Sequence, residues 1–232
     1  MRKIRQIKVI SFDFGGTLAY ETTEDSIIFR QILEEFGYKF DIDEVKSALD
    51  FSREWWRTTK EDKIWNEKEM LNFHRKVLSK LKIPNPEELA EKTSKVLPQR
   101  LDFKPYKDTK PTLENLKMKG YPLVIISNVS SKRNLETYLK KAALIDYFDE
   151  LFASGSIGIE KPNPQIFRKA AEVMKTSCQA IIHIGNSYEN DYLGAKSAGM
   201  KAILIDRNGK YKDKECKRIS NLTQLLELLT IK

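Results

Sequence analysis

Residues 7–18 read IKVISFDFGGTL, a short apolar and β-branched run that is ended by two glycines. A run of this length, closed by a turn signal, predicts a buried strand over Ile7–Phe14 and a tight turn at Gly15-Gly16. Asp13 stands at the carboxyl end of that strand. An ionisable side chain in such a place is the first candidate for chemistry.

The same pattern returns three more times along the chain and alternates with helical stretches. Further strands are predicted over Tyr121–Ser127, Ala180–Ile184 and Lys201–Ile205, with a shorter one at Leu151–Ala153. Helices are predicted over Lys110–Lys119, Pro164–Met174 and Asn190–Ala198. Strands that alternate with helices indicate an α/β fold with right-handed crossovers, a doubly wound parallel sheet of the Rossmann-like kind.

Residues 21–99 have a different character, because apolar residues recur there at helical spacing and strand-like runs are nearly absent. We expect two parts, a catalytic core formed by residues 1–20 and 100–232 and an inserted all-helical part, residues 21–99. Trp55, Trp56 and Trp65 lie in the insert. Two interpretations are open, an aromatic wall beside a substrate or the filling of a small helical bundle.

Composition excludes several classes of protein. The chain has 232 residues, of which 41% are hydrophobic and 32% charged, as in globular proteins rather than disordered ones. No apolar stretch is long enough to span a bilayer. Met1–Gln6 is basic, but Asp13 and the glycines interrupt the apolar run behind it, which argues against a signal peptide and favours the cytoplasm. The two cysteines, Cys178 and Cys216, lack zinc-site spacing.

The formal net charge of +8 suits a nucleic acid or a small anion as partner. Basic and acidic residues are interleaved along most of the chain, and no nucleic-acid-binding motif is present, so we expect a small anionic substrate and neither nucleic acid nor membrane. The sequence is compatible with a monomer or a homodimer.

Polar residues follow the ends of the predicted strands. They are Asp13, Ser127, Asn128, Lys161, Asn186 and Asp191. Ligands of open α/β sheets bind beyond the carboxyl ends of the strands, where the strand order reverses. Each of these residues alone is a weak signal, because Asp, Ser and Asn often cap helices, but the set predicts one site.

In this order the motifs resemble those of the haloacid dehalogenase superfamily. Residues 13–18 (DFGGTL) are similar to its first motif, Ser127-Asn128 to its second, Lys161-Pro162 to its third, and residues 185–191 (GNSYEND) to its fourth. The resemblance covers about residues 1–20 and 100–232. The helical insert stands where that family places a cap over the substrate.

The resemblance implies nucleophilic attack by Asp13 and a covalent aspartyl intermediate that water hydrolyses. It implies further catalytic roles for Lys161, which would neutralise charge, and for Asp191. Thr17, Ser127 and Asn128 would bind the anionic part of the substrate. The family's magnesium site corresponds to Asp13, Gly15, Asn186 and Asp191.

Two positions depart from the family's phosphatases. Gly15 stands where they carry a second Asp that protonates the leaving group, a role usually worth about 10²–10⁴-fold in rate. Asn186 stands where an Asp usually binds magnesium, so the site loses one negative charge and magnesium binding is weakened. The expected function is a hydrolase of small anionic substrates, first of all phosphate esters with a good leaving group.

Three alternatives stay open. A metal-free 2-haloacid dehalogenase would need neither missing carboxylate, although Tyr188 replaces an Asn common in that branch, and its halide-binding arginine would have to be sought among Arg30, Arg53 and Arg57. Family members that cleave carbon–phosphorus bonds also lack the second Asp. A catalytically weak anion-binding protein is the last. His74, His183, Glu21 and Glu189 are weaker candidates for an acid, since each has a structural or solvent-exposed interpretation.

Overall fold

The computed structural model describes residues 7–61 and 63–230. The basic segment 1–6 lies outside the described residues. The strands are β1 (Val9–Phe12), β2 (Ala19–Glu21), β3 (Phe103–Pro105), β4 (Leu123–Ser127), β5 (Glu150–Ala153), β6 (Ile181–Gly185), β7 (Lys201–Ile205) and β8 (Arg218–Ile219). The α-helices are α1 (Asp25–Glu35), α2 (Ile42–Thr59), α3 (Glu67–Lys80), α4 (Glu87–Arg100), α5 (Thr109–Met118), α6 (Lys132–Lys141), α7 (Ser154–Ile157), α8 (Pro164–Val173), α9 (Gly194–Ser197) and α10 (Thr223–Thr230). Short 3₁₀ turns span Ile145–Tyr147 and Cys178–Ala180, and a π-helical turn spans Tyr188–Leu193.

Six strands form one parallel sheet in the order β5-β4-β1-β6-β7-β8. The chain leaves the central strand β1 toward β4 and β5 on one side and later returns to β6 and β7 on the other. The strand order therefore reverses at β1, which puts the carboxyl end of this strand at the switch point. The predicted α/β class with a doubly wound parallel sheet is confirmed.

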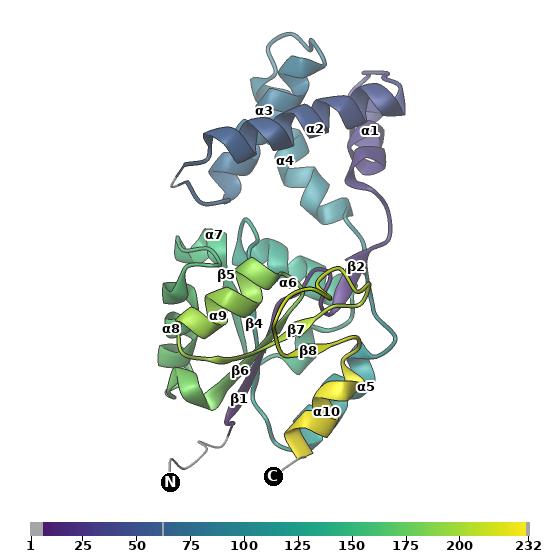
Figure 1. The fold of residues 1–232 in the computed structure, drawn as a ribbon. Coiled ribbons are helices and arrows are strands. Elements are labelled where there is room, and N and C mark those ends of the chain that lie inside the picture. Colours follow the sequence, from purple (N-terminus) through teal and green to yellow (C-terminus); the bar gives the residue numbers. More distant parts are fainter. Residues whose placement is uncertain (1–6, 62, 231–232) are drawn as a thin grey trace.

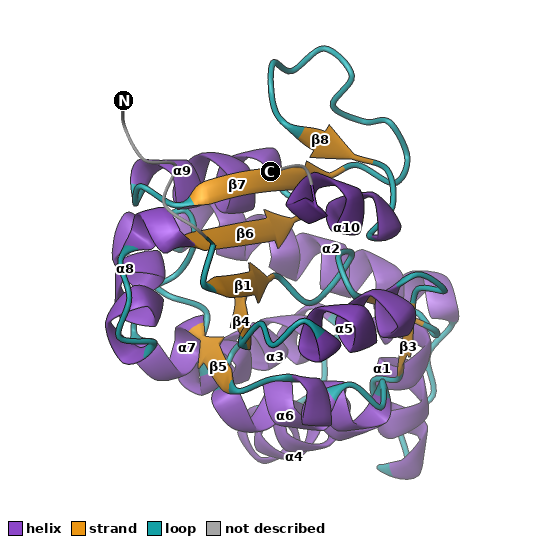
Figure 2. Ribbon diagram, turned by 90° about the horizontal axis from the view of Figure 1, so that it is seen from below, coloured by secondary structure: helices purple, strands orange, loops and turns teal. Residues whose placement is uncertain are grey.

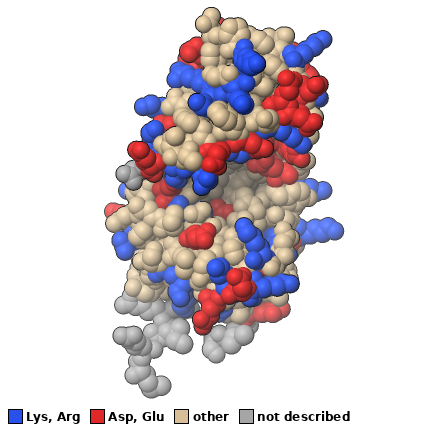
Figure 3. Space-filling model, turned by 45° about the horizontal axis from the view of Figure 1, so that its top comes forward, with Lys and Arg blue, Asp and Glu red and all other residues tan. Residues whose placement is uncertain are grey.

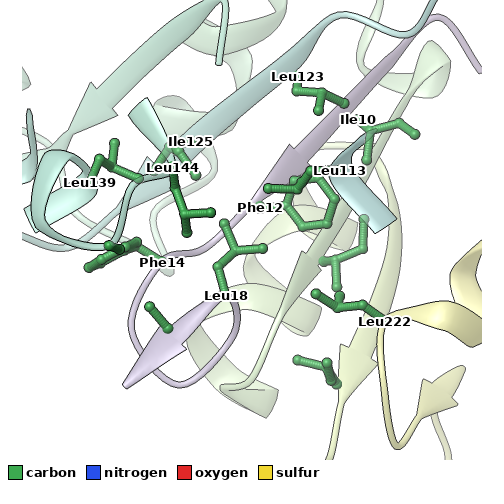
Figure 4. Packing of buried hydrophobic residues seen from close by; sticks show 14 of the residues in the cluster. Ile10, Phe12, Phe14, Leu18, Leu113, Leu123, Ile125, Leu139, Leu144 and Leu222 are labelled. Atoms are coloured by element: carbon green, nitrogen blue, oxygen red, sulfur yellow. The ribbon is translucent and has the colours of Figure 1, made fainter. Parts of the chain in front are cut away.

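Helices cover both faces of the sheet (Figure 2). On one face α5, α6 and α10 pack against alternate residues of the strands, and Figure 4 shows Phe12 and Leu18 among the leucines of this layer. On the other face α8 and the segment around α9 pack against the remaining strand residues, with Phe167 fully buried. The continuous apolar runs of the sequence follow from this arrangement, because both faces of each inner strand are buried.

The four helices α1–α4 form a separate layer above the sheet (Figure 1). They enclose a hydrophobic cluster of their own, in which Phe29, Ile32 and Leu49 are fully or almost fully buried. Helix α2 begins at a capping box in which the Asp41 side chain accepts a hydrogen bond from the Glu44 backbone N–H, and the Glu44 side chain accepts one from the Asp41 backbone N–H. Such a reciprocal cap satisfies two amide groups that the helix itself leaves free.

The antiparallel pair of β2 and β3 was not predicted from the sequence. It joins Ala19 to Pro105 and Glu21 to Phe103, so the chain enters and leaves the helical part at neighbouring points. No helix within residues 7–61 and 63–230 has both the length and the apolar character that a membrane span requires.

Candidate active site

Asp13 follows directly on β1, at the switch point of the sheet. Its backbone N–H still donates to the carbonyl of Ile184 on β6, at 2.9 Å, so the strand pairing fixes its main chain. The residue is 7% exposed. The carboxylate is therefore held in a nearly closed site.

Four side chains surround the two oxygens of Asp13. Lys161 Nζ donates to Oδ1 at 2.8 Å and Ser127 Oγ donates to the same oxygen at 3.3 Å. Thr17 Oγ1 donates to Oδ2 at 3.1 Å, and Asn186 lies against that oxygen as well. The structure thus brings together residues from all four sequence motifs.

Asn128 has a different position from the one its motif suggests. Its Nδ2 donates to the carbonyl of Lys161 at 2.9 Å, and the Lys161 backbone N–H donates to its Oδ1 at 2.8 Å. Both ends of the amide are engaged with the main chain of Lys161. The Asn128 side chain therefore fixes the loop that carries the lysine, and Ser127 is the member of this pair that faces Asp13.

Asp191 is the second carboxylate in contact with Lys161. Its Oδ1 accepts from Lys161 Nζ at 2.5 Å and its Oδ2 accepts from the backbone of Ser187 at 2.8 Å. Only 2% of the residue is exposed. Lys161 is thus shared between the two carboxylates, which balances one buried cation against two anions.

Sequence reasoning missed a second layer of this network. His183 Nε2 lies 3.3 Å from Asp191 Oδ1, and its Nδ1 lies 2.9 Å from Ser11 Oγ. A neutral imidazole that donates to Asp191 can accept from the serine hydroxyl. The parallel pairing of β1 and β6 places Ser11 opposite His183, so two polar residues in otherwise apolar strands were the available signal.

The protonation states follow from burial and charge. Burial lowers the pKa of Lys161, but Asp13 and Asp191 outweigh this and hold the pKa above its ordinary value. Burial raises the pKa of Asp191, whereas Lys161 and His183 bring it well below the usual range. Burial lowers the pKa of His183, with Asp191 acting in the opposite direction. At neutral pH the site therefore contains charged Lys161, ionised Asp191 and neutral His183.

The Gly15 carbonyl and the Asn186 side-chain amide lie beside Asp13 Oδ2. With Nδ2 turned inward, Asn186 donates to the carbonyl of Gly15 at 3.2 Å and to Asp13 Oδ2 at 3.3 Å. Turned by half a rotation, the same amide offers its oxygen at this point, where Thr17 Oγ1 also donates to it at 3.4 Å. Carboxylate, main-chain carbonyl and amide oxygens are the ligands that magnesium accepts. The donor set therefore fits this cation, although within the described residues no group of three His, Cys, Asp or Glu side chains could hold a metal ion.

The remaining candidates lie further out. Arg57 is paired with Glu54 on the exposed surface of α2 and Arg30 lies beside Glu34, whereas Arg53 reaches the space between the two parts of the molecule. Glu189 is exposed. Tyr188 stacks on Tyr192 with ring centroids 5.7 Å apart, away from the contacts of Asp13.

A cavity of about 350 Å³ lies between the helical part and the carboxyl ends of the strands. Asn128, Val129 and Ser130, which directly follow Ser127, contribute to its lining on the side of the sheet. Trp56, Trp65, Phe73 and His74 contribute to it from the helical part. Figure 3 shows the surface hollowed between these two parts.

Comparisons with known proteins identify the family of the chain. A family model described as haloacid dehalogenase-like hydrolase matches residues 10–205. The glyceraldehyde 3-phosphate phosphatase of Methanothermobacter thermautotrophicus is 38% identical over 104 residues, which cover 45% of this chain and 46% of that enzyme. The chain thus matches about half the length of that relative.

Two solved structures share the whole architecture. The HAD phosphatase from Thermococcus onnurineus has a TM-score of 0.67 and 26% identity over 97% of this chain and 98% of its own. The 2-haloacid dehalogenase from Pseudomonas syringae pv. Tomato has a TM-score of 0.72 and 24% identity over 97% of this chain and 98% of its own, a likeness of fold. The motifs, the sheet and the family match agree: the chain belongs to the haloacid dehalogenase-like hydrolase family.

Proposed function

We propose that the protein hydrolyses small phosphate monoesters that have a good leaving group, with Asp13 as the nucleophile. The observation that carries this proposal is the buried Asp13 carboxylate, to which Lys161, Ser127 and Thr17 all donate hydrogen bonds. The family membership and the relative named as a phosphatase support it. In this proposal residues 21–99 act as a cap over the substrate and residues 1–20 and 100–232 as the catalytic core.

The two oxygens of Asp13 have different surroundings, and we assign them different roles. Oδ2 faces Gly15 and Asn186, the side on which a cation would lie. Oδ1 faces Ser127 and Lys161, so this oxygen is the one that attacks phosphorus. The same Lys161 and Ser127 would hold a phosphoryl oxygen and stabilise the charge that develops on it.

Magnesium is the cofactor that we propose. Asp13 Oδ2, the Gly15 carbonyl and the Asn186 side-chain oxygen would hold it. Both Asp191 oxygens already accept hydrogen bonds, so Asp191 would contribute its charge rather than a direct bond. When bound, the cation would neutralise charge on the transferring phosphoryl group. An amide in place of a carboxylate predicts a weak site.

Hydrolysis of the aspartyl intermediate needs a base or a positioned water. We propose that Asp191 keeps Lys161 charged and oriented during both steps, since the lysine is its nearest partner. Asn128 then acts as a positioning residue for the same lysine through two main-chain bonds. These two roles differ from direct substrate contact, which we assign to Ser127 and Thr17.

A metal-free 2-haloacid dehalogenase is the second candidate. Gly15 and Asn186 favour it, because halide leaves without a proton and no cation is required. Arg53 is the arginine nearest to the cavity, but it donates to Asp25 and Asp50 at 2.6 Å each, which leaves it poorly suited to take up a halide. The phosphatase is therefore the function that the geometry supports best.

A small substrate panel separates these functions from a non-catalytic anion-binding role. Aryl phosphates and 2-haloacids are incubated with wild-type protein and with Asp13→Asn, with and without magnesium, and phosphate or halide is measured. We expect magnesium-dependent phosphate release that Asp13→Asn reduces by at least about 10³-fold. Unchanged turnover in Asp13→Asn contradicts the nucleophile assignment. Halide release without magnesium favours the dehalogenase, and phosphate binding without turnover favours the binding role.

A further inference from the structure

The cavity between the two parts of the molecule has an aromatic wall. The Trp56 and Trp65 rings meet edge to face with centroids 5.2 Å apart, and Trp65 and Phe73 do so at 5.5 Å. Within the described residues the cluster that fills the helical part packs against Phe73 but includes neither tryptophan. The two indoles therefore serve the cavity rather than the interior of the bundle, and they offer flat apolar faces and edges to a ligand.

The opposite side of the cavity continues this character. Tyr138 on α6 contributes to the lining and is itself packed against Phe103, with centroids 4.7 Å apart. Leu97 and Pro98 of α4 add aliphatic surface. A volume of about 350 Å³ is at the lower end of the range for small-molecule pockets, which run from about 300 to 1,000 Å³. One ring, or two fused rings, is a ligand of suitable size.

The charges around the cavity exclude a second anionic group on the ligand. Among the described lining residues Arg53 is the single cation, and Asp25 and Asp50 already neutralise it. Glu21 and Asp25 are also part of the lining, and the partial burial of the Glu21 carboxyl together with the nearby Asp25 raises its pKa. A carboxylate or second phosphate placed here would meet like charges and no free partner.

The chemistry at Asp13 independently restricts the leaving group of the ligand. Gly15 cannot donate a proton, so the leaving oxygen must depart as an anion. A phenol has a pKa of about 10, whereas aliphatic alcohols are close to water in acidity, at about 15.7. A phenolate is therefore a far better leaving group than an alkoxide in a site that lacks the acid.

We propose that the leaving group is an uncharged aromatic ring of the phenol type, seated between Trp56, Trp65, Phe73 and Tyr138; this rests on the proposed phosphatase function. Asp13 Oδ1 forms a bond to phosphorus while the phosphorus–aryl oxygen bond breaks, and the phenolate takes that electron pair. Water then attacks phosphorus in the aspartyl phosphate, Asp13 leaves as the carboxylate, and the protons of water pass to the phosphate product and the solvent.

Two substrates with good leaving groups test this inference. 2-Naphthyl phosphate carries an aromatic ring and acetyl phosphate does not, so only the first should depend on the aromatic wall. We expect Trp56→Ala to lower kcat/KM for 2-naphthyl phosphate by at least about tenfold and to leave acetyl phosphate within about twofold. Trp55→Ala is the matched control, because Trp55 is the preceding residue of α2 and packs under Lys76 instead, with Nζ 5.7 Å from the ring centroid.

Each outcome decides the question. An equal loss for both substrates, or no loss for either, overturns the aromatic leaving-group site while the phosphatase function stands. If wild-type protein releases phosphate from neither substrate, the proposed function itself is wrong. A second measurement needs no variant: 2-naphthol should inhibit acetyl phosphate hydrolysis by wild-type protein competitively, and cyclohexanol should not. Equal inhibition by the two alcohols, or none, also overturns the inference.

Discussion

The backbone at Gly15 has room for the carboxylate that the chain lacks. A Cβ built on this residue meets no other atom within 4 Å, and the position is exposed. A side chain added here would extend from the loop that follows Asp13. The absence of an acid at this position is therefore a matter of chemistry and not of space.

The first prediction concerns Gly15→Asp. For a phosphate ester with an aliphatic leaving group, the new acid should raise kcat by about 10–10²-fold, part of the full range for general acids. For 2-naphthyl phosphate the gain should stay below about threefold, because phenolate leaves without help. Gly15→Asn, which has the same shape and no acidic proton, is the control. An equal gain in Gly15→Asn, or an equal gain for both substrates, would contradict the reasoning.

Gly16, the next residue, is constrained where Gly15 is free. Its φ is +76°, and an added Cβ would lie 2.3 Å from Asn186 Nδ2. Gly16→Ala should therefore strain the turn and push the Asn186 amide away from Asp13 Oδ2. We expect the magnesium concentration for half-maximal phosphate release to rise at least about fivefold, which corresponds to about 1 kcal/mol. Gly15→Ala is the control, and a similar change in both variants would rule out this role for the turn.

At the scale of single elements, helix α3 carries a histidine that burial keeps neutral. His74 is 1% exposed, shares a hydrogen bond with Thr93 at 2.8 Å and meets Phe29 edge to face. Burial lowers its pKa to about 3. An unfolded chain takes up the proton near pH 6.5, and the folded chain does not. As the pH falls from 6.5 to about 3, protonation of His74 in the unfolded chain therefore lowers the free energy of unfolding, and raising the pH over the same interval restores it.

The corresponding prediction is a pH-dependent loss of stability. Between pH 7.5 and pH 5, His74 should reduce the free energy of unfolding by about 2 kcal/mol. His74→Gln retains a polar group for Thr93 and does not titrate. The free energy of unfolding that the variant loses between pH 7.5 and pH 5 should therefore be about 2 kcal/mol smaller than the loss in wild-type protein. Chemical denaturation at the two pH values measures both proteins. Parallel curves for wild type and variant would show that His74 is not neutral in the folded protein.

The strands and their ends were the predictable part of the fold, for a physical reason. An inner parallel strand is buried on both faces, so the sequences of β1, β4, β6 and β7 are mostly apolar and do not alternate regularly between polar and apolar residues. Strand β2 has three residues, of which Tyr20 and Glu21 are exposed, and its partner β3 lies more than 80 residues away. So short a pair has no periodic signal, and only the tertiary structure reveals it.

The candidate site was predictable as a set of positions, and less so as a set of roles. The motifs named Asp13, Ser127 and Lys161, which lie in contact. The engagement of Asn128 with the main chain of Lys161 depends on side-chain direction across 33 residues of sequence. The sequence also could not separate the roles of Trp55 and Trp56. They are neighbours on one helix, but Trp55 lies against Lys76 and Trp56 lines the cavity.

At the scale of the whole molecule, the helical part touches the sheet part beside the candidate active site. Lys60, just after α2, forms an ion pair with Glu160, and the backbone N–H of Trp65 lies 3.5 Å from the same carboxylate. Glu160 directly precedes Lys161 in the chain. The contact therefore joins the end of the helical part nearest the aromatic wall to the loop that holds Lys161.

The last prediction is that this ion pair helps to hold the cap over a bound substrate. Its side chains are 37% and 19% exposed, so the pair should contribute no more than about 1 kcal/mol. We expect Lys60→Met to raise KM for 2-naphthyl phosphate by about two- to fivefold at low salt, with kcat changed by less than twofold, and the difference from wild type to shrink at high salt as the charges are screened.

A double-mutant cycle separates the ion pair from other effects of Glu160. If the pair acts as a unit, Glu160→Gln should raise KM in wild-type protein and have little effect in Lys60→Met. The exchanged pair, Lys60→Glu with Glu160→Lys, should recover part of the loss. Additive single effects would mean that Glu160 acts on Lys161 or Trp65 alone. With additive effects, the contact between Trp65 and the aromatic ring of the substrate would keep the helical part in place, and the Lys60–Glu160 ion pair would not.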